Sequence, residues 1–427
     1  LVWSCDRLML AGSRSGRLRN LSLTIAFAAL QLLAGHAQTT WYTWLLIAAW
    51  LLWRLSAAPN GLRGRRFVGV IWIGVAGIVA AAIAAAQLLP TAELLSQSQR
   101  SAAAEYGFAM TYSFSPWRFL TLLAPDALGT PAGREFFGYG MYLEDAVYSG
   151  VIALMLALAT MGVWAWRSLR QWRFKRKQDE PERLEMHAET PLGLAVCLIV
   201  AGAVLGLGAN TPVFPWLYAH VPTFNMFQAP TRFMLWLVFG LALLAGWGAT
   251  RWRTVEGRGL YWARLGTAGA AGLAIVAWAL ALALQPGDRG QTLMRWMALG
   301  VVPAGVNLAI FGALTLLAPG PGSEKTQPVS WRRIRTQAWP ALVIVALAAD
   351  LVTANWGVNP GAAADLYARP GAADAAIKAA VGTGRLFSFP DDEHTLKFEP
   401  YFSFESYGDP PTMARGARDV LVPNTGM

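Results

Sequence analysis

The chain has 427 residues, of which 55% are Ala, Val, Ile, Leu, Met, Phe, Trp, Tyr or Cys and only 14% are charged. A soluble domain has about 25% charged residues, so this composition excludes an ordinary soluble globular protein. The net charge of +10 resembles that of nucleic-acid-binding proteins, but the basic residues gather between apolar runs, which disfavours that class. The two cysteines, Cys5 and Cys197, lie far apart, which excludes a disulfide framework or a zinc site.

Apolar runs of the length that a bilayer requires recur along the chain. The runs predicted to cross the membrane are 21–35, 40–53, 67–89, 146–166, 191–208, 233–250, 265–284, 297–318 and 338–356. The first two runs are short, so they are either two tilted spans or one re-entrant hairpin broken at Gly35 and His36. The chain is therefore predicted to be an all-α polytopic membrane protein with about nine transmembrane helices, or seven and a hairpin, within residues 1–356.

The Lys and Arg residues are distributed unevenly between alternate connections. The set formed by residues 1–20, 54–66, 167–190, 251–264 and 319–337 carries 23 of them, whereas the opposite set carries 6. Because short basic connections stay in the cytoplasm, the N-terminus is predicted to lie inside and the C-terminus outside.

Two outer segments are too long to be simple connections. Residues 90–145 contain four prolines and the amphipathic stretch Trp117–Leu123, and they are predicted to form an ordered outer subdomain with an interfacial helix. Residues 357–427 form a polar tail in which Arg385–Phe389 and Tyr401–Phe404 alternate like strands. The tail is predicted to be the start of an α/β or β-rich extracytoplasmic domain. The chain begins without Met and stops within a loop, and we expect it to be truncated at both ends.

Polar residues gather where the predicted topology places the outer membrane face. The Glu144–Asp145 pair is the catalytic candidate, and the substrate-binding candidates are His36, Gln38, Arg232 and Asp350. Asp350 lies inside an apolar run, where an acid is costly unless it faces the bundle interior or a wet cavity. Each candidate also has a structural interpretation, such as helix capping, interfacial anchoring or hydrogen bonding within the bundle. No Walker loop, HExxH or GxSxG motif is present, which disfavours an ATP-driven pump.

Three segments carry a resemblance to the bacterial YfhO-type membrane proteins. Leu32–Gln38 resembles their Gly-His-Pro-Gln turn, with Ala37 in place of Pro, and Glu144–Gly150 is similar to their Glu-x-x-x-Tyr-x-Gly segment at a helix start. Leu207–Phe233 resembles their Gly-x-x-Thr-Pro and Arg-x-Pro-x-Arg-Phe loop, with Gln228 in place of the first Arg.

The resemblance implies a GT-C-like glycosyltransferase of the bacterial cytoplasmic membrane. Such an enzyme transfers a sugar from a polyprenyl-phosphate carrier to a cell-envelope polymer on the outer face. The chemistry needs a carboxylate base, a cation or dipole for the departing phosphate, and an amphipathic groove for the prenyl tail. In this family the base usually lies in the first outer loop, which would precede Leu1. No cofactor is expected, a divalent metal is left open, and no nucleic acid is expected as a partner.

A transporter or flippase of a lipid-linked envelope precursor is the alternative. It predicts charges buried at mid-membrane and an inverted repeat of several helices. The sequence offers only a weak internal echo, Gln31–Leu33 and Gln87–Leu89, so the glycosyltransferase is favoured.

The charge asymmetry makes the topology testable. Alkaline phosphatase fused after Met427 is expected to be active because the tail lies outside, and the same enzyme fused within residues 167–190 is expected to be inactive. Enzyme activity measured in whole cells reports both positions, and the reverse pattern would contradict the topology and every outer-site assignment.

Overall fold

The structure is a computed structural model of the 427-residue chain. It describes residues 1–58, 60–98, 104–130, 135–137, 142–173, 192–252, 258–284, 289–318, 329–358, 374–382 and 405–406. The chain forms two compact units, and each is described by itself. Unit 1 comprises Leu1–Met110 and Thr160–Leu244, and unit 2 comprises Thr111–Ala159 and Ala245–Met427.

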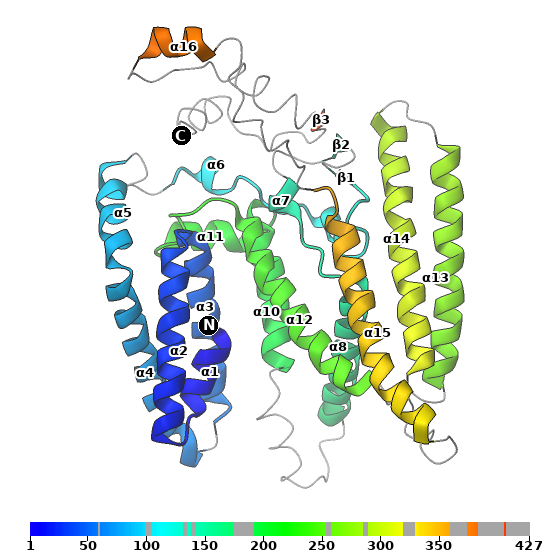
Figure 1. The fold of residues 1–427 in the computed structure, drawn as a ribbon, viewed down its shortest axis with the longest axis horizontal. Coiled ribbons are helices and arrows are strands. Elements are labelled where there is room, and N and C mark those ends of the chain that lie inside the picture. The colour runs from blue at the N-terminus through cyan, green and yellow to red at the C-terminus, as the bar shows by residue number, and fades with distance from the viewer. Residues whose placement is uncertain are drawn as a thin grey trace. The chain divides into compact units, whose positions relative to one another are not determined.

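Unit 1 contains the first helices of the chain, starting with α1 (Figure 1). They are α1 (Val2–Leu10), α2 (Arg14–Leu33), α3 (Ala37–Ser56), η1 (Asn60–Leu62), α4 (Arg63–Ile83), α5 (Ala85–Gln97), α6 (Tyr106–Ala109), α10 (Leu192–Gly206), η5 (Gly208–Asn210), α11 (Val213–His220) and η6 (Pro230–Phe233). Two further helices, α8 (Val151–Arg173) and α12 (Met234–Arg251), are shared with unit 2.

Unit 2 contains the remaining elements. They are η3 (Pro116–Leu122), β1 (Gly129–Thr130), β2 (Glu135–Phe136), α7 (Tyr142–Asp145), α13 (Arg258–Ala283), α14 (Arg289–Leu317), α15 (Val329–Asn355), α16 (Asp374–Val381) and β3 (Glu405–Ser406). The strands form a small sheet of order β1-β2-β3, antiparallel between β1 and β2 and parallel between β2 and β3. The predicted strands at 385–389 and 401–404 lie outside the described residues.

Each of the nine predicted apolar runs overlaps an α-helix. Among the described residues, five helical segments have the length and apolarity to cross a bilayer: Arg63–Ile83, Pro230–Thr250, Ala263–Ala283, Gly290–Leu317 and Ala338–Asn355. The chain is thus a helical, multi-pass membrane protein, and the count of nine spans stays a prediction. The first two runs form separate helices of 20 residues each, α2 and α3, separated at Gly35, whose φ of +76° favours glycine.

Three local expectations differ from the structure. The basic segment 1–20 contains α1, whose buried face is formed by Ser4, Cys5, Leu8 and Met9. The run 67–89 divides at Ala84, and α5 continues past Pro90 to Gln97, although a proline inside a helix removes a backbone hydrogen bond and clashes with the preceding turn. The stretch Trp117–Leu123 forms a 3-10 helix, η3, up to Leu122 rather than an α-helix.

An aromatic core holds unit 1 together. Phe233 is fully buried, and its ring centroid lies 4.5 Å from that of Tyr42 and 5.2 Å from that of Trp236. Gly202 of α10 permits this packing, because a Cβ at that position would lie 2.5 Å from the backbone nitrogen of Leu237. The contact links α3, α10, η6 and α12.

Helices α13 and α14 pack side by side in unit 2 (Figure 1). The close approach depends on Gly305 of α14, where an added Cβ would lie 2.8 Å from the Cβ of Ala274 and 2.9 Å from the carbonyl oxygen of Ala270. Small residues at such a contact let two helix backbones meet and gain dispersion energy, which is what associates helices in lipid.

We expect Gly305→Ala to destabilise this helix pair by about 1–3 kcal/mol, because the new methyl group overpacks against backbone atoms. Thermal unfolding in detergent micelles measures the loss. Gly269→Ala in α13 is the matched control, since nothing lies within 4 Å of its added Cβ. Equal melting temperatures for the two variants would contradict the packing argument.

Candidate functional site

A cavity of about 150 Å³ lies in unit 2, in the predicted outer subdomain and beside the start of α8. Its walls come from η3, the segment before β1, α7, the residues preceding α8, and the end of α15. The residues that line it are Arg118, Thr121, Pro125, Leu128, Gly129, Tyr142, Asp145, Ala146, Val147, Tyr148, Ala354 and Asn355. The lining thus combines an ion pair and two phenols with apolar surface.

The ion pair joins Arg118 to Asp145, with 2.7 Å between guanidinium Nη1 and carboxylate Oδ2. Both residues are buried, at 4% and 8% exposure. Arg118 points inward because η3 is a 3-10 helix, in which side chains three residues apart share one face; Thr121 is buried with it, while Trp117 is exposed. A second guanidinium nitrogen, Nη2, donates to the carbonyl oxygen of Phe137 at 3.0 Å.

The cavity changes the acidity of its carboxyl group. Burial raises the pKa of Asp145 to about 6; the Arg118 guanidinium opposes this rise, and Glu144 adds to it. Burial also raises the pKa of the Tyr142 phenol to about 12. A carboxylate with a pKa near neutrality is both largely ionised at pH 7 and able to accept a proton, as a general base requires.

The structure separates the two members of the predicted catalytic pair. Asp145 lines the cavity, whereas Glu144 is half-buried and does not line it. Consecutive residues of a short helix point in different directions, so only one of the two acids can face the cavity.

Asp350 lies behind one cavity wall rather than in the lining. It is 2% exposed on α15 and accepts a hydrogen bond from the backbone nitrogen of Val151 at 2.8 Å and from Asn307 Nδ2 at 2.7 Å. The phenol of Tyr148, which does line the cavity, also donates to it. The acid inside the apolar run is therefore satisfied by donors from three parts of unit 2.

Gly150 makes this arrangement possible. Its φ is +90°, and a Cβ at this position would lie 3.2 Å from Asp350 Oδ2. The carboxylate can then reach the first backbone N–H of α8, where a helix has unpaired donors and a positive dipole end. The segment Tyr148–Gly150 thus has a physical role as the place where α15 fixes the start of α8.

His36 caps a helix in unit 1. It is the residue before α3, and its Nδ1 accepts a hydrogen bond from the backbone nitrogen of Thr39 at 3.1 Å. The side chain is exposed. This contact satisfies one of the free donors of the first turn of α3, as its structural interpretation predicted.

Gln38 and Arg232, which are distant in sequence, are brought together in unit 1. A guanidinium nitrogen of Arg232 donates to the side-chain oxygen of Gln38. The amide nitrogen of Gln38, which is buried, donates to the hydroxyl oxygen of Tyr42 at 2.6 Å and to the carbonyl oxygen of Gln228 at 2.5 Å. Gln38 therefore ties α3 to the loop that precedes α12.

Arg118 is the site residue that the sequence candidates omitted. Arg118 lies within the predicted interfacial stretch Trp117–Leu123, where an exposed cation needs no functional explanation. Its position could have indicated a functional role, because Arg118 lies on the predicted outer side, where basic residues are disfavoured. The same argument identified Arg232 as a candidate.

No protein-family model, curated protein or solved structure matches the chain. Within the described ranges, no group of three or more His, Cys, Asp or Glu side chains could hold a metal ion.

The buried pair makes a pH-dependent contribution to stability. Folding raises the pKa of Asp145 from 3.8 to about 6, so the folded state favours the protonated carboxyl. Its contribution to the free energy of unfolding therefore falls as pH rises from about 3.8 to 6 and is constant above that range.

We expect Arg118→Gln to raise the pKa of Asp145 further, because it removes the cation that lowers it. The variant should lose about 3 kcal/mol at pH 8, where an unpaired charge is buried, and less at pH 5. Melting temperatures across this pH range measure the effect. Arg118→Gln combined with Asp145→Asn is the control and should lose the pH dependence; a uniform loss in both variants would contradict the assignment.

Proposed function

We propose that the chain is part of a membrane glycosyltransferase that transfers a sugar from a polyprenyl-phosphate carrier to a cell-envelope acceptor. The observation that carries the proposal is the buried Arg118–Asp145 pair in a cavity beside the start of α8. It supplies, in one place, the two charged groups that this chemistry needs. The resemblance of three sequence segments to YfhO-type proteins supports the same reaction.

In the proposed mechanism, Asp145 takes the proton from the acceptor hydroxyl. The hydroxyl oxygen attacks the anomeric carbon, the bond from that carbon to the phosphate oxygen breaks, and the polyprenyl phosphate leaves with the bonding electron pair. The raised pKa of Asp145 suits a base that works near neutral pH. Arg118 keeps Asp145 ionised and can donate to the phosphate oxygens, because a guanidinium presents several donors in a fixed plane.

The remaining candidates have different places in the proposal. Glu144 tunes the acidity of Asp145, since its negative charge raises the pKa of that carboxyl. Asp350 positions the cavity wall through Tyr148 and Val151. Substrate binding by His36, Gln38 and Arg232 stays a prediction, and in the structure these side chains contact the protein itself.

The test is a transfer assay with radiolabelled undecaprenyl-phosphate-linked hexoses in membranes that carry the full-length protein. We expect label in a polymer fraction, and a loss on the order of 10²–10⁴-fold for Asp145→Asn, as removal of a general base produces. Glu93→Gln, which removes an exposed acid of α5, is the control and should transfer at the parental rate.

The pH profile tests the pairing. The transfer rate should fall below pH 6, because protonated Asp145 cannot accept a proton. This fall should move to higher pH in Arg118→Lys, because an ammonium lacks the planar fork with which the guanidinium holds the carboxylate. It should move to lower pH in Glu144→Gln, which removes a neighbouring negative charge. A profile that is identical in all three proteins would overturn the role of Asp145. Movement of the carrier across proteoliposomes without polymer labelling would instead support a transporter.

A further inference from the structure

The N-terminal part of unit 1 has a pronounced excess of arginine. Residues 1–92 contain a single acid, Asp6, and no lysine. The same stretch contains eight arginines, at positions 7, 14, 17, 19, 54, 63, 65 and 66. Charge balance therefore leaves seven guanidinium groups without a carboxylate from this part of the chain.

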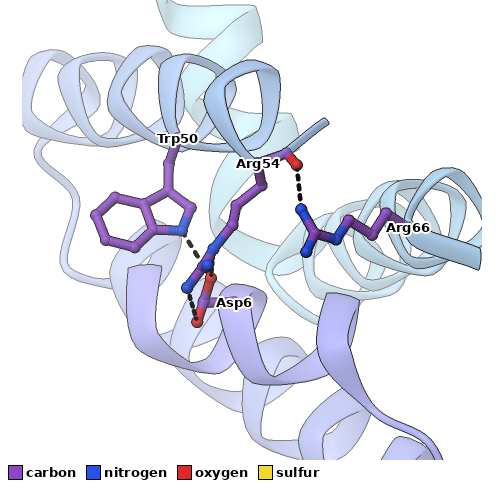
Figure 2. Close-up of polar contacts among 4 residues, drawn as sticks. All are labelled: Asp6, Trp50, Arg54 and Arg66. Atoms are coloured by element: carbon purple, nitrogen blue, oxygen red, sulfur yellow. Dashed lines mark hydrogen bonds and ion pairs between the residues drawn. The ribbon is translucent and has the colours of Figure 1, made fainter. Parts of the chain in front are cut away.

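The carboxylate of Asp6 is hydrogen-bonded to Arg54 and Trp50 (Figure 2). Asp6 Oδ1 accepts a hydrogen bond from Arg54 Nε at 2.6 Å and from Trp50 Nε1 at 2.9 Å, while Oδ2 accepts from Arg54 Nη2 at 3.0 Å. Arg66 donates to the carbonyl oxygen of Arg54 at 2.6 Å. These contacts fix α1 against the end of α3, where Arg66 of α4 also bonds, and they pair the carboxylate of Asp6 with Arg54.

Five of the other arginines lie in the second half of α1, in the first two turns of α2 and in the first turn of α4. We define this arginine collar as the exposed residues Arg7, Arg14, Arg19, Arg63 and Arg65. The elements that carry them touch one another. A Cβ added at Gly12, in the turn between α1 and α2, would lie 2.5 Å from a guanidinium nitrogen of Arg65, and one added at Gly69 of α4 would lie 2.6 Å from the Cα of Met9. No carboxylate among the described residues is within 4 Å of the collar.

Exposed apolar side chains lie among the collar arginines. Trp3, Leu18 and Phe67 are 58%, 56% and 59% exposed, and Leu10 and Leu62 are exposed beside them. The guanidinium of Arg7 lies 5.8 Å from the ring centroid of Trp3. Trp3, Arg7 and Leu10 are all exposed on α1. Helices that lie at a lipid headgroup layer have this composition, with Trp and Leu next to cations.

We propose that the arginine collar binds the headgroup phosphates of anionic phospholipids. Arg63 and Arg65 of the collar lie at the start of α4, a helix with the length and apolarity to cross a bilayer, so these two cations sit at the end of a candidate membrane-spanning helix. Arginine rather than lysine fits this ligand, because a planar guanidinium binds two phosphate oxygens at once. The adjacent Trp, Leu and Phe side chains favour a lipid over a soluble anion, since they can contact the acyl chains below the phosphate.

The test is native mass spectrometry of the full-length protein in detergent, titrated with phosphatidylglycerol or phosphatidylcholine. We expect phosphatidylglycerol adducts at concentrations at least tenfold below those needed for phosphatidylcholine. Replacing Arg14, Arg19 and Arg65 together by Gln should weaken phosphatidylglycerol binding at least tenfold. Replacing the same three by Lys keeps the charge and loses the planar fork, so it should give a smaller loss.

Two comparisons keep the proposal falsifiable. Melting temperatures without added lipid show whether the triple Gln variant is folded, and Arg65→Gln alone serves if it is not, with an expected loss of several-fold. Equal binding of the two lipids, or unchanged phosphatidylglycerol binding in the Gln variants, would overturn the proposal. Displacement of phosphatidylglycerol by millimolar inorganic phosphate would also overturn it, because it would identify a soluble-anion site.

Discussion

A polar group buried in apolar surroundings must find its partner within the protein, and Asp350 shows what this requirement does to the fold. Its carboxylate draws donors from Val151 at the start of α8 and from Asn307 of α14, as well as the phenol of Tyr148. The cost of leaving such a group unpaired in an apolar medium is several kcal/mol. The carboxylate thus fixes α8, α14 and α15 together, and the cavity wall depends on that arrangement.

The same requirement separates the arginines that are withdrawn from solvent from those that are exposed. Arg118 is buried and Arg54 is half-buried, and each is paired with one acid, Asp145 or Asp6. The collar arginines are exposed and face no described acid. A buried cation therefore organises unit 2 around a cavity, whereas exposed cations leave one end of unit 1 open to an external anion.

The sequence predicted the helices well and the site only in part. Each of the nine apolar runs between charged residues falls on an α-helix, because a segment in lipid must satisfy its backbone hydrogen bonds internally. Asp145 was named, but its partner Arg118 depends on the inward face of a 3-10 helix, which apolarity alone does not reveal. The paired residues of β2 and β3 are 270 positions apart in the chain, and nothing in the local sequence of either strand indicates this pairing.

The contact between Val151 and Asp350 also has a consequence for biogenesis. The two residues are 199 positions apart, and unit 2 itself consists of two separate stretches of chain with much of unit 1 between them. At synthesis rates of about 5–20 residues per second, the first turn of α8 waits roughly 10–40 s for its capping carboxylate. During this interval the early stretch of unit 2 lacks α14 and α15, which follow it in the chain and supply Asn307 and Asp350, the partner of its Val151, so completion of unit 2 follows that of unit 1.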